Sequence, residues 1–404
     1  MCLPGQTRLV WDGSTGMSCS TPWTVGPRRR MGRFSMERDG TSCVSVAFFL
    51  LIWSDGIVSG QFSAPSVTER SMKAWIFYPP LKTMSGGCMV LLQIARQLLA
   101  MGRLGGVLYW EAAPEGADYA GLPWVRAGQA RIAPEDVFLV PEGWPNALVF
   151  GFRARCRTMI YCQNWAYLFH GLDAGVRWRD LPVEFLAVSD PVAWHLEQVL
   201  GRRPGIIRPA IDTAVFHPGE TKPEGPVRVA FMPRKNKALA DQVRRIFEER
   251  NPVAAVEWVP IQGQDRAGVA GMLRSCHVFL ATGFPEGFAL PPLEAMACGC
   301  LCAGFAGFGG WDYMRQAEAG SFSPQGYALR AVPWGGNGWW AADGDVLGAA
   351  LGLERAVAAI LSGETVVSAV RSGAASAAAY NAGAQAAEIL AALDTERVLR
   401  AGRS

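Results

Sequence analysis

The sequence predicts an α/β protein with two Rossmann-like, doubly wound domains that face each other across a cleft. Apolar runs of strand length alternate with helical segments twice, first over residues 73–217 and again from residue 227. This alternation is typical of parallel sheets covered by helices. A polar stretch with Pro223 and Gly225 separates the two series, as a linker would. We expect a poorly structured extension at 1–70, domains at 71–220 and 221–365, and a helical tail at 366–404.

The first domain is expected to open with a strand at 73–78, because this run is aromatic and β-branched and stops at two prolines. Ser85-Gly86-Gly87 then predicts a loop, and the apolar spacing from Met89 to Met101 predicts a helix. Further strands are expected at 106–110, 136–140, 158–162, 185–188 and 206–208. Ser189 and Asp190 are good helix caps for a helix over 191–200.

The second domain is expected to contain strands at 227–232, 254–259, 278–281 and 301–305. Helices are expected from about residue 237 to Arg250, over 269–276, and from near Pro291, where the missing N–H of proline is tolerated. Asp343-Gly344-Asp345 predicts the cap of a helix that reaches about Leu361. The Ala-rich tail over 366–399 is expected to be helical.

Composition excludes several classes of protein. Half of the 404 residues are hydrophobic and 18% are charged, which indicates a globular chain. A formal net charge of +3 is small for this length and argues against a nucleic-acid binder. The ten cysteines show no metal or disulfide spacing, so a reducing cytoplasm is the expected location. Cys298, Cys300 and Cys302 are expected to alternate along a buried strand as small apolar residues.

The first 70 residues contain one apolar run, Val44 to Trp53, with four arginines upstream: Arg28, Arg29, Arg30 and Arg33. A charged flank and an apolar core of this length are typical of a signal peptide, although the run lies far from Met1. Two alternatives stay open: a secretory segment, or an extended start whose true first residue is Met36 or Met72. No stretch reaches the roughly 18 apolar residues of a membrane-spanning helix.

The segment from Phe284 to Gly299 carries the clearest functional pattern. Glu286 and Glu294 lie eight positions apart, the first beside Gly287 on a loop after a strand and the second at the start of a helix. Two carboxylates in this arrangement can each bind a pair of hydroxyl groups of one ligand. The unpaired N–H groups of the loop and of the helix start can face phosphate oxygens.

This segment resembles the E-x7-E donor-site signature of retaining GT-B glycosyltransferases of family 4, commonly E-G-F-G-L-P-x-x-E-A-M-A-x-G. It departs at Ala289, where the family usually has glycine. Ile211 to Pro218 is similar to the I-D-x-x-x-F-x-P element that the family places between its domains. The resemblance covers about residues 73–380 and implies a GT-B fold and a hexosyltransferase-like activity on a nucleotide-sugar donor.

The resemblance also implies roles for residues at the donor site. Glu294 would hold the ribose hydroxyls, and Glu286 the hydroxyls of the donor sugar. Backbone N–H groups would contact the sugar or the phosphates, and these belong to Gly287, Phe288, Ala289, Gly86 and Gly87.

Cationic side chains follow the strand at 227–232, and the carboxyl ends of such strands bind ligands. Arg234 and Lys235 can neutralise the charge that builds on the departing diphosphate. The family carries an arginine and a lysine here, and whether Lys235 or Lys237 plays the family's lysine role is left open. An ordinary solvated basic turn is the alternative.

On the acceptor side, the resemblance matches His170 by region only. His170 follows the loop Gln163-Asn164-Trp165, where Asn164 and Trp165 either shape an acceptor pocket or pack. Glu142 ends a strand at the expected cleft face and is a further acceptor candidate.

We expect the activity to be retaining and metal-independent, with no cofactor. Asp343-Gly344-Asp345 is interpreted as a helix cap, and no His/Asp cluster suits Mg²⁺ or Mn²⁺. The expected partners are a nucleotide sugar and a glycan, lipid-linked or other acceptor, with peripheral membrane contact and a role in bacterial polysaccharide or glycoconjugate synthesis. The alternatives are a catalytically silent GT-B scaffold and a nucleotide-sugar epimerase.

Overall fold

The computed structural model describes residues 71–81, 84–319, 322–362 and 366–401. All of these belong to one compact unit of the chain, residues 68–404. The expected extension at 1–70 and its apolar run therefore lie outside the described residues. Among the described helices, none is both long and apolar enough to span a bilayer.

The first sheet contains seven parallel strands in the order β3-β2-β1-β4-β5-β6-β7. They are β1 (Ala74–Phe77), β2 (Leu104–Tyr109), β3 (Trp124–Arg126), β4 (Val137–Pro141), β5 (Arg157–Cys162), β6 (Glu184–Ala187) and β7 (Gly205–Ile206). The order reverses between β1 and β4, and loops after the carboxyl ends of two such strands form the usual ligand crevice. The helices of this part are α1 (Gly86–Ala100), α2 (Leu148–Ala154) and α3 (Asp190–Leu200).

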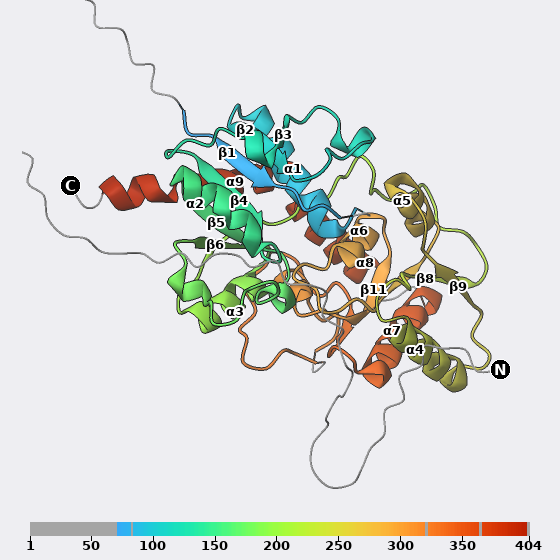
Figure 1. Ribbon diagram of the computed structural model, residues 1–404. Helices are drawn as coiled ribbons and strands as arrows, with labels where there is room; N and C mark the ends of the chain where they lie inside the picture. The colour runs from blue at the N-terminus through green and yellow to red at the C-terminus, as the bar shows by residue number, and fades with distance from the viewer. Residues whose placement is uncertain (1–70, 82–83, 320–321, 363–365, 402–404) are drawn as a thin grey trace, which may run out of the picture. The chain divides into compact units, whose positions relative to one another are not determined.

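The second sheet has five parallel strands in the order β12-β11-β10-β8-β9. Figure 1 labels β8, β9 and β11 of this sheet. They are β8 (Val227–Phe231), β9 (Val256–Pro260), β10 (Val278–Ala281), β11 (Leu301–Phe305) and β12 (Trp339–Ala341). The helices are α4 (Lys237–Arg250), α5 (Arg266–Arg274), α6 (Leu290–Ala297), α7 (Val346–Ser362), α8 (Val366–Ala379) and α9 (Ala382–Ala401). Here the order reverses between β8 and β10. The loop after β8 carries Arg234 and Lys235, and the loop after β10 carries Glu286, so both loops leave the sheet at the point where the strand order reverses.

The predicted α/β class with two parallel sheets is confirmed, and most of the predicted strands lie within two residues of the observed ones. Three short elements, β3, α2 and β12, were not predicted. Two of them are three-residue strands, which are too short to show a period of two. The predicted cap of α7 is also confirmed, because Asp345 Oδ1 accepts the N–H of Gly348 at 2.9 Å.

The expected loop at Gly86 and Gly87 was wrong. Helix α1 already begins at Gly86, because Ser85 is its N-cap and its side chain accepts the N–H of Cys88. Both glycines therefore lie in the first turn of a helix. The placement of the three cysteines on one strand was also wrong: all three are buried, but only Cys302 lies in β11, while Cys298 ends α6.

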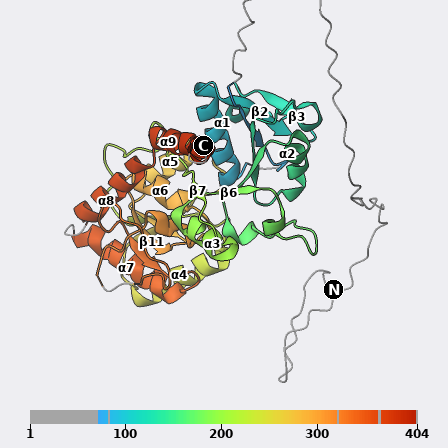
Figure 2. The same cartoon turned by 90° about the vertical axis from the view of Figure 1, so that its left-hand side faces the viewer.

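The tail is two helices and not one continuous helix. The break comes at Tyr380 and Asn381, where Asn381 Oδ1 accepts the N–H of Ala384 and caps α9. Helix α8 packs on α6 of the second sheet, whereas α9 packs on α1 of the first (Figure 2). The tail thus covers both sheets.

A buried ionic cluster joins the two sheets and the tail. Asp312, which follows β11, has no exposed surface and accepts hydrogen bonds from Arg208 Nε at 2.8 Å and Tyr380 OH at 2.6 Å. It also accepts the N–H of Asp190 at the start of α3 at 2.6 Å. Burial alone would raise the pKa of Asp312, but Arg208, Arg330 and Tyr380 outweigh it and lower that pKa. The side chain is therefore held as a charged carboxylate at the junction.

Candidate functional site

The glutamate loop joins β10 to α6 and is braced against the loop that follows β11. The N–H of Glu286 donates to Gly307 O at 3.0 Å, and the N–H of Gly309 donates to Glu286 O at 2.9 Å. A Cβ atom on Gly309 would lie 2.1 Å from Gly287 O, so this contact needs glycine. Ala289 has φ −79°, which any residue adopts, so the departure from the family's glycine causes no strain.

Gly287 is the point where this loop meets the first sheet. Ser189 Oγ donates to Gly287 O at 2.6 Å. A Cβ atom at position 287 would lie 1.9 Å from Gln163 O, inside the van der Waals limit. The glycine is therefore required by close approach of backbone from the other sheet.

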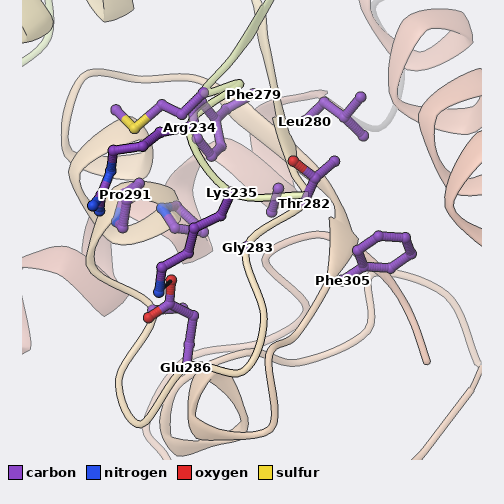
Figure 3. A pocket seen from close by; sticks show the side chains of 13 residues that line it. Arg234, Lys235, Phe279, Leu280, Thr282, Gly283, Glu286, Pro291 and Phe305 are labelled. Atoms are coloured by element: carbon purple, nitrogen blue, oxygen red, sulfur yellow. Dashed lines mark hydrogen bonds and ion pairs between the residues drawn. The ribbon is translucent and has the colours of Figure 1, made fainter. Parts of the chain in front are cut away.

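The loop after β8 faces the glutamate loop. Lys235 Nζ lies 2.7 Å from Glu286 Oε1, and the two side chains point toward each other in Figure 3. Arg234 is exposed, and no ion pair or hydrogen bond of its guanidinium is found within the described part of the chain. Lys237 points elsewhere, pairing with Asp241 on the exposed side of α4 at 2.6 Å. Of the two lysines, Lys235 is the one that the fold brings to Glu286.

Glu294 lies one turn into α6, and its residue is 9% exposed. Its carboxylate forms no hydrogen bond with the described residues. Burial raises the pKa of Glu294 to about 7, and the charge of Arg266 opposes this shift. A desolvated carboxylate without partners is suited to accept hydrogen bonds from ligand hydroxyls.

These side chains line one cavity of about 1050 Å³ between the two sheets. Ten of the predicted site residues contribute to it: Gly86, Gly87, Glu142, Asn164, His170, Arg234, Lys235, Glu286, Phe288 and Glu294. A smaller hollow of about 60 Å³ lies beside it, behind Arg234 and Lys235, and Ala289 lines it (Figure 3).

The first turn of α1 faces the start of α6 across this cavity. A Cβ atom on Gly86 would lie 3.6 Å from Leu290 Cδ1. Because Gly86 and Gly87 lie in the first turn, their N–H groups have no acceptor within the helix. The start of α1 can therefore bind an anion, as expected of the glycines, although from a helix and not from a loop.

Glu142 holds the protein's own backbone. It is buried and accepts the N–H groups of Gln163 at 3.0 Å and Asn164 at 2.8 Å. Burial raises the pKa of Glu142 to about 7, while these hydrogen bonds oppose the shift. Asn164 Nδ2 in turn donates to Pro285 O at 3.0 Å, next to Glu286. Glu142 and Asn164, which follow β4 and β5, thus connect the carboxyl ends of these strands to the glutamate loop.

The remaining predicted residues lie around the cavity. His170 is exposed and lines it. Trp165 packs against His195 and Phe308 and is outside the cavity lining. Phe288 lines the cavity, and its ring packs against Tyr313 and Tyr380.

The sequence analysis did not identify three residues that help to form the site: Asn236, Arg266 and Asp312. Asn236 Nδ2 donates to the carbonyls of Thr282 and Phe284, both at 3.0 Å, and holds the two second-sheet loops together. Arg266 faces Glu294 from α5 and lies over the ring of Phe216. Asp312 joins the sheets. For Asn236, the only indication in the sequence was its place shortly after the end of a predicted strand.

Among the described residues, no group of three or more His, Cys, Asp or Glu side chains is placed to hold a metal ion. Metal independence stays a prediction, because the charges on the donor side are a reason to expect it but not a test of it.

No protein-family profile matches the chain. The chain is 27% identical over 198 residues to an α-1,6-glucosyltransferase from Actinobacillus pleuropneumoniae serotype 7 (strain AP76). The match covers 47% of this chain and 59% of that protein, so it spans less than two thirds of the relative.

Solved structures show the same architecture. A glycosyltransferase from Rickettsia africae ESF-5 has a TM-score of 0.58 and 10% identity, covering 81% of this chain and 99% of that one. Sucrose-phosphate synthase from Thermosynechococcus elongatus has a TM-score of 0.55 and 12% identity, and the match covers 82% of this chain and 100% of that one. The Anabaena protein HepE, solved with UDP-glucose, has a TM-score of 0.53 and 14% identity, and the match covers 80% of this chain and 99% of that one. At these identities the similarity establishes the fold: the chain has the GT-B glycosyltransferase architecture.

Proposed function

We propose that this protein is a retaining, metal-independent glycosyltransferase of the family 4 type that moves a sugar from a nucleotide-sugar donor to an acceptor. One observation carries the proposal. Arg234, Lys235, Glu286 and the unpartnered Glu294 line a single cavity at the switch point of the second sheet. The glucosyltransferase relative and the GT-B architecture support it.

The donor's diphosphate fits beside Arg234 and Lys235. Arg234 has its guanidinium free for two phosphate oxygens, and Lys235 adds a point charge. The N–H groups at the start of α1 lie on the opposite wall of the same cavity and add partial positive charge. Together these groups stabilise the negative charge that the leaving diphosphate develops.

The two glutamates bind hydroxyl groups. Glu294, buried and unpartnered, accepts from the ribose hydroxyls. Glu286 accepts from hydroxyls of the donor sugar, and its 2.7 Å contact with Lys235 orients it. Neither carboxylate has to act as a nucleophile in this scheme.

The reaction then runs on one face of the donor sugar. The bond between the anomeric carbon and the diphosphate oxygen breaks, and a bond from the acceptor oxygen to the same carbon forms on the same face. The acceptor's hydroxyl proton passes to the departing phosphate oxygen. The products are a nucleoside diphosphate and a glycoside with the donor's configuration. A cytoplasmic role in bacterial polysaccharide or glycoconjugate synthesis, with contact to the membrane surface, is part of the proposal.

The deciding experiment is incubation of the full chain with a panel of nucleotide sugars while nucleoside diphosphate release is measured. We expect release with at least one donor, unchanged by EDTA, and an anomeric proton coupling in the product that matches the donor. Binding without release would indicate a scaffold, and conversion of the donor sugar alone an epimerase. An inverted product, or loss of turnover in EDTA with rescue by Mn²⁺, would overturn the mechanism.

A further inference from the structure

The two walls of the large cavity differ in charge. On the second-sheet wall, the described lining residues include three cations, Arg234, Lys235 and Arg266, together with three acidic residues, Asp265, Glu286 and Glu294. On the first-sheet wall, the described lining residues include no lysine or arginine, and the acidic ones are Glu142 and Asp173. The N–H groups at the start of α1 also lie on the first-sheet wall, and we assign them to the donor's diphosphate. A second phosphate or a carboxylate bound to this wall would meet two acidic side chains and no described cationic side chain.

The first-sheet wall also presents aromatic side chains. Trp144 lines the cavity and is fixed from behind by tilted or edge-on contacts with Phe77 and Trp110, at centroid distances of 6.0 and 5.8 Å. Tyr167 lines the same wall and is 48% exposed. Rigid, partly exposed rings of this kind offer a flat apolar surface that loses little entropy when a ligand packs on it.

Hydrogen-bonding side chains lie next to these rings in the sequence. Asn146 lies two residues after Trp144, and His170 lies three residues after Tyr167. Both are exposed, line the cavity and are free to bond hydroxyl groups. The indole N–H of Trp144 likewise has no acceptor among the described residues. Apolar rings next to hydrogen-bonding side chains match a sugar, whose ring has C–H faces and hydroxyl groups at its edge.

We propose that the acceptor is a neutral glycan that packs on Trp144 and Tyr167, and not a phosphate-bearing or uronic acid acceptor. This inference rests on the proposed glycosyltransferase function and names its acceptor class. A phosphorylated or lipid-phosphate acceptor would bring its charge toward Glu142 and Asp173 without a described cation on that wall to balance it. The cavity volume of about 1050 Å³ is at the upper limit of ordinary small-molecule sites, about 300–1,000 Å³, and leaves room for two ligands.

The test uses the full chain on an array of neutral, uronic and phosphorylated oligosaccharides in the presence of UDP, followed by titration of the strongest binder. We expect neutral glycans to be preferred. Trp144→Ala should weaken that binding at least tenfold, and Tyr167→Ala several-fold. The matched control is Phe169→Ala, since Phe169 is 59% exposed on the same loop but does not line the cavity. It should change binding less than twofold.

Two further measurements keep the outcomes separate. Calorimetry with UDP, ADP and GDP reports on the donor site alone. Absence of binding to all three in the parent protein would count against the proposed function, while the array still decides the acceptor class. Thermal melting, with Trp144→Phe as the conservative variant, separates lost packing from lost contact, because Phe should restore most of the binding.

Lys82 is a basic residue of the β1–α1 segment that lies outside the described residues. Lys82→Gln should leave the glycan preference unchanged. The proposal is overturned by a preference for phosphorylated or uronic glycans, by absence of binding to any neutral glycan, or by binding to phosphatidylglycerol vesicles that Trp144→Ala abolishes.

Discussion

The switch points of the two sheets are used in different ways. After β8 and β10, the second sheet presents charged side chains whose ends face the cavity, such as Arg234, Lys235 and Glu286. After β4, the first sheet ends in Glu142, a buried carboxylate that is occupied by the protein's own backbone N–H groups. The same topology thus places free charged side chains at the second sheet and a carboxylate already bound to backbone at the first sheet. This difference suits one charged and one neutral substrate.

The largest expected effect comes from breaking the buried cluster that joins the two sides. Asp312→Ala would remove the buried carboxylate that Arg208 and Arg330 share and leave Arg208 paired with Glu388 alone, so we expect the free energy of unfolding to fall by about 3 kcal/mol. Urea denaturation measures this. The control is Asp241→Ala, because Asp241 is an exposed partner of Lys237 and its loss should change the stability little. Equal effects of the two variants would mean that Asp312 does not join the sheets energetically.

The second prediction concerns the backbone contact between the sides. Gly287→Ala places a Cβ atom 1.9 Å from Gln163 O, and backbone cannot yield as a side chain can. We expect a loss of about 1–3 kcal/mol of stability and a large loss of turnover, because Glu286 moves with the loop. Gly128→Ala is matched, since no atom lies within 4 Å of its Cβ position. A Gly287→Ala protein with normal turnover would disprove the tight contact.

The third prediction tests the charged side alone. Arg234→Ala should weaken nucleoside diphosphate binding by about ten- to hundred-fold, or roughly 1.5–3 kcal/mol, with little change in melting temperature. Lys237→Ala should bind normally, because that lysine pairs with Asp241 outside the cavity. Calorimetric titration compares the affinities of the two variants for nucleoside diphosphate. Identical affinities would show that the diphosphate does not bind at Arg234.

The smallest expected effect depends on pH. Burial raises the pKa of Glu294 from 4.5 to about 7, so the folded protein holds a proton that the unfolded chain has released. Stability should therefore fall by at most about 1.4 kcal/mol per pH unit as pH rises from 4.5 to about 7, and Glu294→Gln should reduce the slope. Nucleotide affinity should change in the opposite direction, because ribose hydroxyls donate better to the ionised carboxylate. Glu142, with a similarly raised pKa, contributes to the stability slope but not to nucleotide binding. Parallel slopes in parent and Glu294→Gln proteins would show that Glu294 titrates normally.

The sequence by itself determined the α/β class, the bounds of β10 and β11, and the grouping of Arg234, Lys235, Glu286 and Glu294 at the ends of strands of one sheet. These features are local: periodicity, helix caps and spacing within a short segment are set by nearest neighbours along the chain. Even the helix start at Gly86 was signalled locally, by the cap Ser85, although it was taken for a loop.

Only the tertiary structure decided which groups meet across long separations. It brought Lys235 to Glu286 while Lys237 turned outward, it set Gly287 against Gln163, and it placed Asp312 between Arg208 and Tyr380. It also made Glu142 an acceptor for the backbone N–H groups of Gln163 and Asn164, while the expected acceptor contact of Glu142 stays a prediction. Burial is the physical reason in each case. A carboxylate withdrawn from water must find hydrogen-bond donors or shift its pKa, and which donors reach it depends on how the two sheets pack.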